Sequence, residues 1–99
     1  MANIAFIKVT KEWVSVEELI GNSFSFDSTK TYILEGRGSG GVLVLESDTV
    51  PDSNSRAGNK LDGLGYKTAE YKVGTGTLYA RREVNSLDSG LNISEKEEE

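Results

Sequence analysis

Apolar and polar positions alternate along most of the chain in short runs, and clusters of Gly, Ser, Asp and Asn interrupt them about every 8 to 12 residues. This spacing is typical of all-β domains. We therefore predict an antiparallel β sandwich or flattened barrel of about seven short strands. The extended segments that the pattern indicates are residues 4–9, 13–16, 24–26, 31–35, 42–45, 66–73, 77–82 and 91–94.

Local signals refine this picture at three places. Ser15 and Glu18 have capping-box spacing and Gly21 follows, which predicts one helical turn between them. The glycine cluster at 36–41 and the Gly-Thr-Gly at 74–76 each separate two predicted strands, so we expect a hairpin at both.

The run Val-Leu-Val-Leu at 42–45 is apolar on both sides, although a two-layer sandwich covers one face of each strand. The loop at 48–59 is polar and offers little apolar cover, so we expect a second subunit there. We predict a homo-oligomer, a ring or trimer, in which either the face of Val42 and Val44 or the strand at 4–9, added to a sheet edge of a neighbouring subunit, contributes to the contacts. The interface candidates are Ile4, Phe6, Ile7, Val42, Val44, Arg81 and Arg82.

The predicted organisation is an N-terminal strand or arm at 1–12, one β domain at 13–94 and a disordered acidic tail at 95–99. The predicted core of this domain contains Trp13, Phe24, Phe26, Ile33, Leu43, Leu45, Leu78 and Ile93.

The amino-acid composition excludes several classes of functional site. The chain has no Cys and no His, which removes disulfides, thiolate metal sites, cysteine nucleophiles and the residue most used for proton transfer near pH 7. We therefore expect no enzyme, no cofactor and no metal. The net charge is −5, of which the tail carries −3, and no basic stripe suits nucleic acid. No apolar run approaches the ~18 residues of a membrane span, and no leader sequence is evident, so we expect synthesis in a cytoplasm.

Several motifs invite chemical interpretations that their details oppose. The glycines at 36–41 lack the Lys-Ser/Thr pair of a phosphate loop, and Arg56 stands at a ligand position of the calcium-loop pattern that begins at Asp52. Four carboxylates could serve glycoside hydrolysis, but their spacing selects no pair; they are Glu35, Glu46, Asp48 and Glu70. A carbohydrate-binding module remains an alternative, with Tyr66 and Tyr79 as candidate stacking rings.

The order of short motifs carries a resemblance. It runs Trp13-Val14, Leu19-Ile20-Gly21, Lys-Thr-Tyr-x-Leu at 30–34, Val-x-Val-x-Glu at 42–46, Pro51, Gly65-Tyr66, Gly-x-Gly-x-Leu-Tyr at 74–79 and Leu-Asn-Ile-Ser at 91–94. This order resembles small β-sandwich accessory proteins of tailed-bacteriophage virions. The resemblance implies a decoration, connector or appendage component of the head, neck or tail, made in the bacterial host cytoplasm. It would contact copies of itself and other virion proteins, without enzymatic activity or cofactor. A small phage regulator or inhibitor of a host protein is a further alternative.

Overall fold

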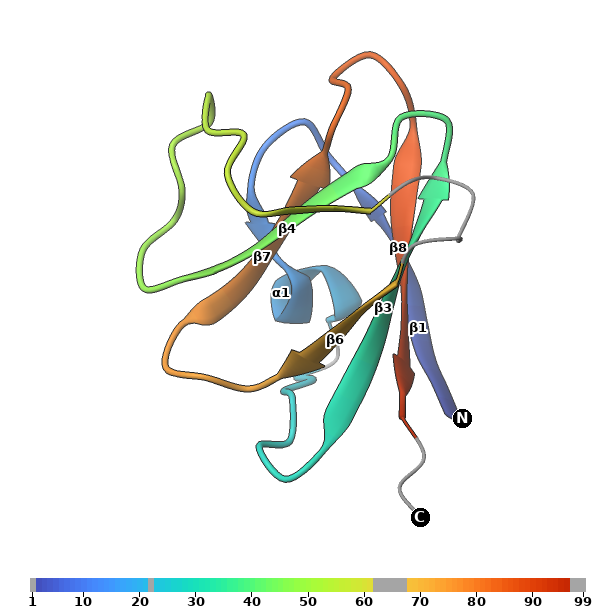
Figure 1. Ribbon diagram of the computed structural model, residues 1–99, viewed down its shortest axis with the longest axis vertical. Coiled ribbons are helices and arrows are strands. Elements are labelled where there is room, and N and C mark those ends of the chain that lie inside the picture. Colours follow the sequence, from blue (N-terminus) through green and yellow to red (C-terminus); the bar gives the residue numbers. More distant parts are fainter. Residues whose placement is uncertain (1, 22, 62–67, 97–99) are drawn as a thin grey trace.

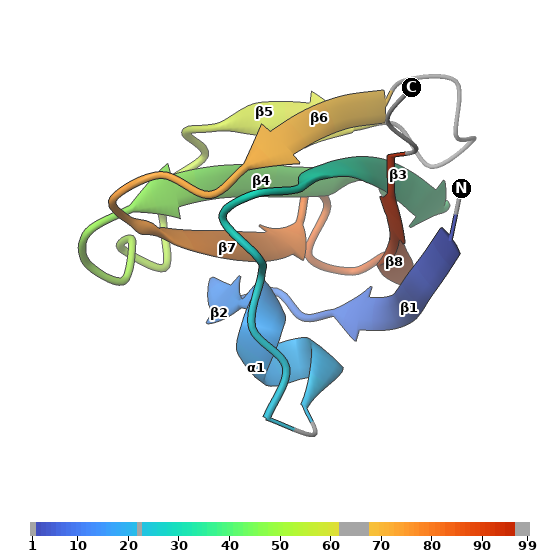
Figure 2. The ribbon, with the colours of Figure 1, turned by 90° about the horizontal axis from the view of Figure 1, so that it is seen from below.

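The computed structural model describes residues 2–21, 23–61 and 68–96, which form two antiparallel four-stranded sheets packed together (Figures 1 and 2). Sheet A has the order β1 (Ala2–Val9), β8 (Ser89–Glu95), β3 (Thr31–Gly38) and β6 (Thr68–Lys72). Sheet B has the order β2 (Val14–Ser15), β7 (Thr77–Arg82), β4 (Val42–Ser47) and β5 (Asn59–Leu61). The predicted all-β sandwich is confirmed, with eight strands in the described ranges where about seven were expected.

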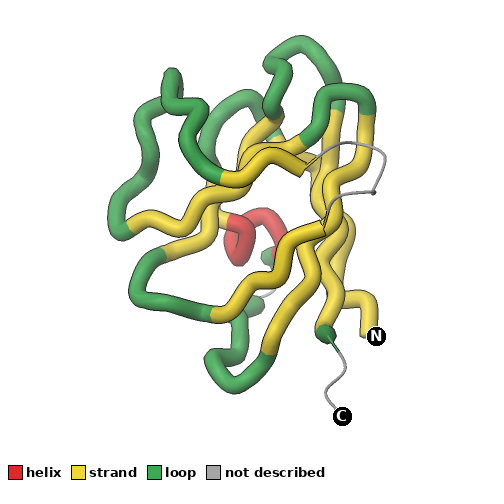
Figure 3. The backbone as a smooth tube through the Cα atoms, viewed as in Figure 1, coloured by secondary structure: helices red, strands yellow, loops and turns green. Residues whose placement is uncertain are grey.

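The chain passes repeatedly from one sheet to the other. Among the described strands, β4 and β5 are the one pair that is adjacent both in sequence and in a sheet. β3 continues through Gly38, and residues 39–41 then carry the chain from sheet A to sheet B, as do residues 73–76 after β6 (Figure 3). Both predicted hairpins are therefore wrong: β3 and β6 pair with each other, whereas β4 and β7 pair in the opposite sheet.

The core lies between the sheets and is built by strand alternation. Leu91 and Ile93 of the central strand β8 and Leu34 of β3 point inward from sheet A, with exposures of 0 to 2 %. Val42 and Val44 of β4 meet them from sheet B, at 0 and 3 % exposure. The interface role predicted for these two valines needs exposed side chains, and the structure encloses both in the chain's own core instead.

One short helix, α1 (Val16–Ile20), lies against β1, β2 and β7 (Figure 2). Its N-cap is Ser15, whose side chain accepts a hydrogen bond from the Glu18 backbone N–H, and Gly21 ends it at φ 74°. This is the helical turn that the capping spacing predicted. Val16 buries completely in the core, so the helix contributes packing as well as a connection.

The segment at 24–26, predicted to be extended, contains no strand. Phe26 packs edge-on against Tyr32 and Tyr71, with ring centroids 4.8 and 5.0 Å apart. Its backbone N–H donates to Glu17 at 2.7 Å. Aromatic contacts and one side-chain acceptor thus hold this segment in place of strand pairing.

The outer face of sheet B carries a second apolar cluster of Trp13, Leu43, Leu45 and Tyr79. Residues 48–58, here called the strap, are tied to this face. The Trp13 indole Nε1 donates to the Ser55 carbonyl at 3.1 Å, and Arg81 donates through Nη1 to the Ser53 carbonyl. The second face of β4 is therefore covered by the chain's own strap, through its backbone carbonyls, where a second subunit was expected.

The N-terminal segment belongs to the chain's own sheet. β1 pairs with β8 from Ala2 opposite Glu95 to Val9 opposite Ser89. Ile7 and Val9 are buried, at 6 and 1 % exposure. The interpretation of residues 4–9 as an arm that reaches a neighbouring sheet is therefore replaced by an edge strand of sheet A, because its inward side chains complete the core.

Candidate functional site

A row of three residues crosses the outer face of sheet A. Gly90 of β8 is in register with Lys8 of β1 on one side and with Arg37 of β3 on the other. Both flanking side chains are exposed, whereas the glycine has no side chain to fill the space between them. The register therefore creates a hollow with one cationic side chain on each side.

Phe6 forms the wall of this hollow. Its ring is 54 % exposed and lies over Gly90, where an added Cβ would stand 2.5 Å from the Phe6 Cζ. Gly38 adjoins it with φ +104°, and a Cβ there would meet the Asp88 carbonyl oxygen at 2.6 Å. Both positions need glycine, so bare backbone forms the floor.

We call this feature the Phe6 groove. It has a volume of about 150 Å³ and is lined by Phe6, Lys8, Arg37, Gly38, Arg82, Asp88, Ser89 and Gly90. Arg37 donates to the Glu35 carboxylate, whereas Lys8 has no hydrogen bond or ion pair to another described residue. The Ser89 Oγ is buried and likewise has no partner in the described part of the chain. The groove thus combines an exposed aromatic ring with the Lys8 ammonium group, which pairs with no other described residue.

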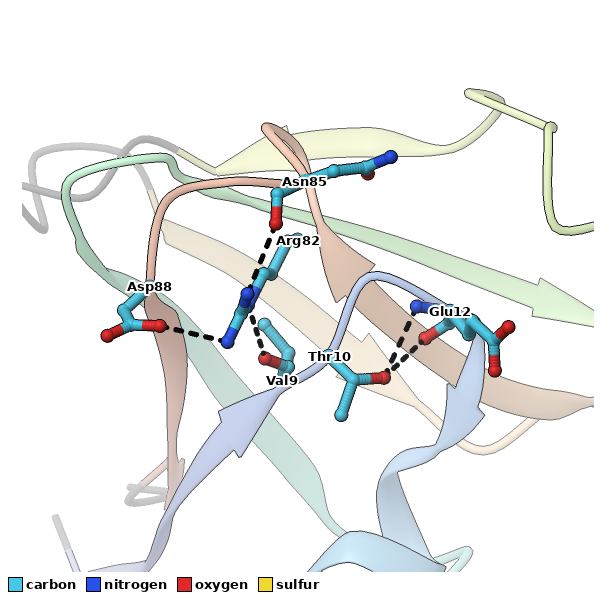
Figure 4. Close-up of polar contacts among 6 residues, drawn as sticks. All are labelled: Val9, Thr10, Glu12, Arg82, Asn85 and Asp88. Atoms are coloured by element: carbon cyan, nitrogen blue, oxygen red, sulfur yellow. Dashed lines mark hydrogen bonds and ion pairs between the residues drawn. The ribbon is translucent and has the colours of Figure 1, made fainter.

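Arg82 closes one end of the groove and is fully engaged (Figure 4). Its Nε donates to the Val9 carbonyl at 3.1 Å, Nη1 to the Asn85 carbonyl at 3.1 Å, and Nη2 to Asp88 Oδ1 at 2.9 Å. Its backbone N–H donates to the Thr10 carbonyl at 2.7 Å. Arg82 therefore fixes the end of β1 against β7 and the β7–β8 loop, and so holds the rim of the groove.

The predicted interface residues divide between surface and interior. Phe6 and Arg82 come together in the groove. Ile4 is half-buried and packs against the core, and Ile7 lies within it, as do Val42 and Val44. Arg81 is 1 % exposed on the outer face of sheet B, with its guanidinium 5.9 Å from the Trp13 ring centroid.

Of the two residues proposed for sugar stacking, the structure describes one, Tyr79. Tyr79 is 9 % exposed and packs with Trp13 and Leu43, so its ring face is not open to a ligand. Tyr66 lies outside the described residues. Tyr32 and Tyr71 are also buried, at 3 and 8 % exposure.

Three of the four candidate carboxylates have separate partners. Glu35 pairs with Arg37, Glu70 with Lys96, and Glu46 accepts from the Gly74 backbone N–H at 3.0 Å. No group of three or more carboxylates able to hold a metal ion gathers in the described ranges. Within the same ranges, no helix has the length and apolar character to cross a membrane. The glycines at 36–41 lead into β4 and not into a helix, as expected for a simple connection.

Sequence reasoning missed Lys8, Arg37, Gly38 and Gly90. An isolated glycine inside an alternating strand marks a close approach of another group, and Gly90 precedes such a pattern. That signal could have located the floor of the groove. Its neighbours could not be found, because the register of β8 with two strands distant in sequence places them there.

Comparison with known proteins found no matching family model, no matching curated protein and no matching solved structure. A function for this chain is therefore inferred from its own residues.

Proposed function

We propose that this chain is a non-enzymatic assembly protein that binds copies of itself, and other structural proteins, through the Phe6 groove. The observation that carries the proposal is the Phe6 ring, which is 54 % exposed on a sheet face beside three cationic side chains. Binding hot spots are enriched in aromatic and arginine side chains, and a rim of polar groups surrounds them. Phe6, Arg37 and Arg82 supply this combination.

The groove alone is too small to hold an assembly together. Stable interfaces bury on the order of 1,200 to 2,000 Å² in total, so Phe6 would be the central anchor of a wider contact across the outer face of sheet A. The Lys8 ammonium, which is unpaired among the described residues, favours a partner that brings a carboxylate next to an apolar group. A net charge of −5 means that every copy of this chain carries such carboxylates in excess.

The virion of a tailed bacteriophage is the proposed setting. This part of the proposal is supported by the order of the sequence motifs from Trp13 to Ser94, and a ring or trimer of the chain would be the functional unit. Localisation to the virion and contacts with other virion proteins belong to the same proposal.

Size-exclusion chromatography with light scattering at micromolar concentration tests self-assembly. We expect the wild-type chain to be oligomeric and Phe6→Glu to shift the mass toward a monomer, because a charge at the anchor must be desolvated. Val50→Glu is the matched control: Val50 is 66 % exposed on the strap, away from the groove, and its replacement should leave the mass unchanged. A monomeric wild type, or equal effects of both variants, would refute self-assembly through Phe6.

A further inference from the structure

Three arginines converge on one asparagine in the β7–β8 loop. Arg56 Nη2 and Arg81 Nη2 both donate to Asn85 Oδ1, at 3.3 and 2.7 Å. Arg82 Nη1 donates to the Asn85 backbone carbonyl at 3.1 Å (Figure 4). A neutral residue thus accepts from three positive side chains that come from the strap and from β7. We call Arg56, Arg81, Arg82 and Asn85 the arginine cluster.

The charge of this cluster is poorly compensated. Among the described residues, no carboxylate pairs with Arg56 or Arg81. Glu83, the nearest acidic residue in sequence to Asn85, gives Arg56 its backbone carbonyl at 3.0 Å, while its carboxylate pairs with Lys60 at 2.9 Å. Arg82 does pair with a carboxylate, that of Asp88.

Burial makes the imbalance more costly at Arg81. Its side chain is 1 % exposed, and its acceptors are two backbone carbonyls and the Asn85 amide oxygen. Burial lowers the pKa of the Arg81 guanidinium, and the nearby positive charge of Arg56 lowers this pKa further, although Glu12 opposes both effects. A negative group at Asn85 would relieve this repulsion directly.

We propose that the arginine cluster binds an oxyanion, a carboxylate or phosphate group, at the outer side of Asn85. Guanidinium groups bind such groups through paired, charge-assisted hydrogen bonds. Arg56 and Asn85 are exposed and provide the entry, whereas Arg81 is fixed below them. The site lies outside the Phe6 groove except for Arg82, and oxyanion binding does not depend on self-assembly.

Thermal unfolding at constant ionic strength tests this site. Sodium phosphate or sodium succinate replaces sodium chloride stepwise up to tens of millimolar, and we expect the unfolding midpoint to rise with either oxyanion because a ligand of the native state stabilises it. A response to phosphate alone would assign a phosphate site, and a response to succinate alone would assign a carboxylate site. A wild-type midpoint that responds to neither salt would overturn the proposal.

Two variants locate the response. Arg56→Gln removes the exposed arm of the cluster and should abolish most of the midpoint rise, whereas Lys72→Gln, which removes an exposed cation outside both the cluster and the Phe6 groove, should retain it. Asn85→Asp places a negative charge inside the cluster, between Arg56 and Arg81, and so removes the excess positive charge that would attract an oxyanion; its midpoint should be higher in chloride and insensitive to the added anions. An Asn85→Asp protein that responds as the wild type does would show that the anions bind elsewhere.

A readout that does not depend on stability completes the test. Arginine Nε–Hε resonances report directly on guanidinium contacts in solution. We expect phosphate or succinate to shift resonances of Arg56 and Arg81 in the wild type and to leave that of Arg37 unchanged. Shifts of similar size at all arginines would indicate diffuse ion screening and would contradict a defined site.

Discussion

Arg81 and Trp13 show how single residues let a polar strap cover an apolar sheet face. The strap contributes few apolar side chains, yet both residues bury beneath it and donate to its carbonyl groups. A polar backbone can enclose an apolar cluster when its carbonyls find donors, because an unpaired buried carbonyl is the main cost of such cover.

Leu43→Ala tests whether this outer cluster contributes to stability. Leu43 is 5 % exposed and packs with Trp13 and Tyr79, so truncation should lower the free energy of unfolding by about 2 to 5 kcal/mol through lost burial and a residual cavity. Urea unfolding measures the change, with the exposed Val50→Ala as control. A loss no larger than that of the control would mean that the strap leaves this face open in solution.

Tyr71 predicts a pH dependence at the alkaline end. Burial, followed by the charges of Glu46 and Glu17, raises the pKa of Tyr71 to about 12 from an ordinary value of 10.0. The folded state therefore holds this proton more tightly than the unfolded state, so the contribution is complete below pH 10 and is lost as the pH rises toward 12. Tyr71→Phe should flatten the fall in urea midpoint over this range. An unchanged slope would show that Tyr71 ionises freely in the folded protein.

At single positions, the sequence predicted burial better than it predicted roles. Four of the eight predicted core residues are buried, namely Trp13, Leu43, Leu78 and Ile93. The other four are half-buried, namely Phe24, Phe26, Ile33 and Leu45. Burial of a large apolar residue is favourable whether the opposite sheet or a loop covers it. The alternation of apolar residues does not show whether the opposite sheet, a loop or another subunit covers a given side chain. Val42 and Val44 therefore pack in the chain's own core, where a second subunit was expected. Phe6 lies on the outer face of β1, opposite to the face that buries Ile7.

The sequence located individual strands more reliably than it identified which strands pair. The strand pattern located β3, β4, β7 and β8, since each is an apolar run bounded by turn residues. The two glycine turns predicted hairpins, but a hairpin would have placed neighbouring strands in one sheet. β7 is buried at four successive positions and is an interior strand of sheet B. β6 has one solvent-exposed face and is an edge strand of sheet A. Burial on both faces outweighed the local turn signal.

The strap offers a prediction at the scale of an element. Trp13→Phe keeps an aromatic ring in the outer cluster but removes the Nε1 donor to the Ser55 carbonyl. We expect a loss of about 1 kcal/mol, the usual net value of a hydrogen bond, concentrated in local opening of residues 48–58. Limited proteolysis should cut the strap faster in this variant than in wild type, with Val50→Ser as the control. Equal cleavage rates would show that Arg81 holds the strap alone.

The topology of the whole molecule pairs the first described strand with the last. β1 and β8 pair along their length, and β8 is also the inner partner of β3, so the last strand cannot be placed until both distant segments are in position. Such non-local pairing slows folding relative to hairpin-rich sheets of the same size. It also explains why the candidate groove escaped detection from the sequence, since Lys8, Arg37 and Gly90 become neighbours only through these pairings.

Deletion of residues 2–9 distinguishes an integral first strand from a detachable arm. The deletion removes the buried Ile7 and Val9, each worth about 1.5 to 3 kcal/mol, together with the pairing along β8 and the Val9 acceptor of Arg82. A total near 3 to 6 kcal/mol from these two side chains alone is a large share of the 5 to 15 kcal/mol typical of a domain. We therefore expect the deleted chain to lose cooperative unfolding in urea, as measured by circular dichroism. Phe6→Glu, which changes the same strand only on its exposed face, should unfold cooperatively. A deleted chain that still unfolds in one sharp transition would mean that β1 adds little to the core, and would restore the arm as an assembly element.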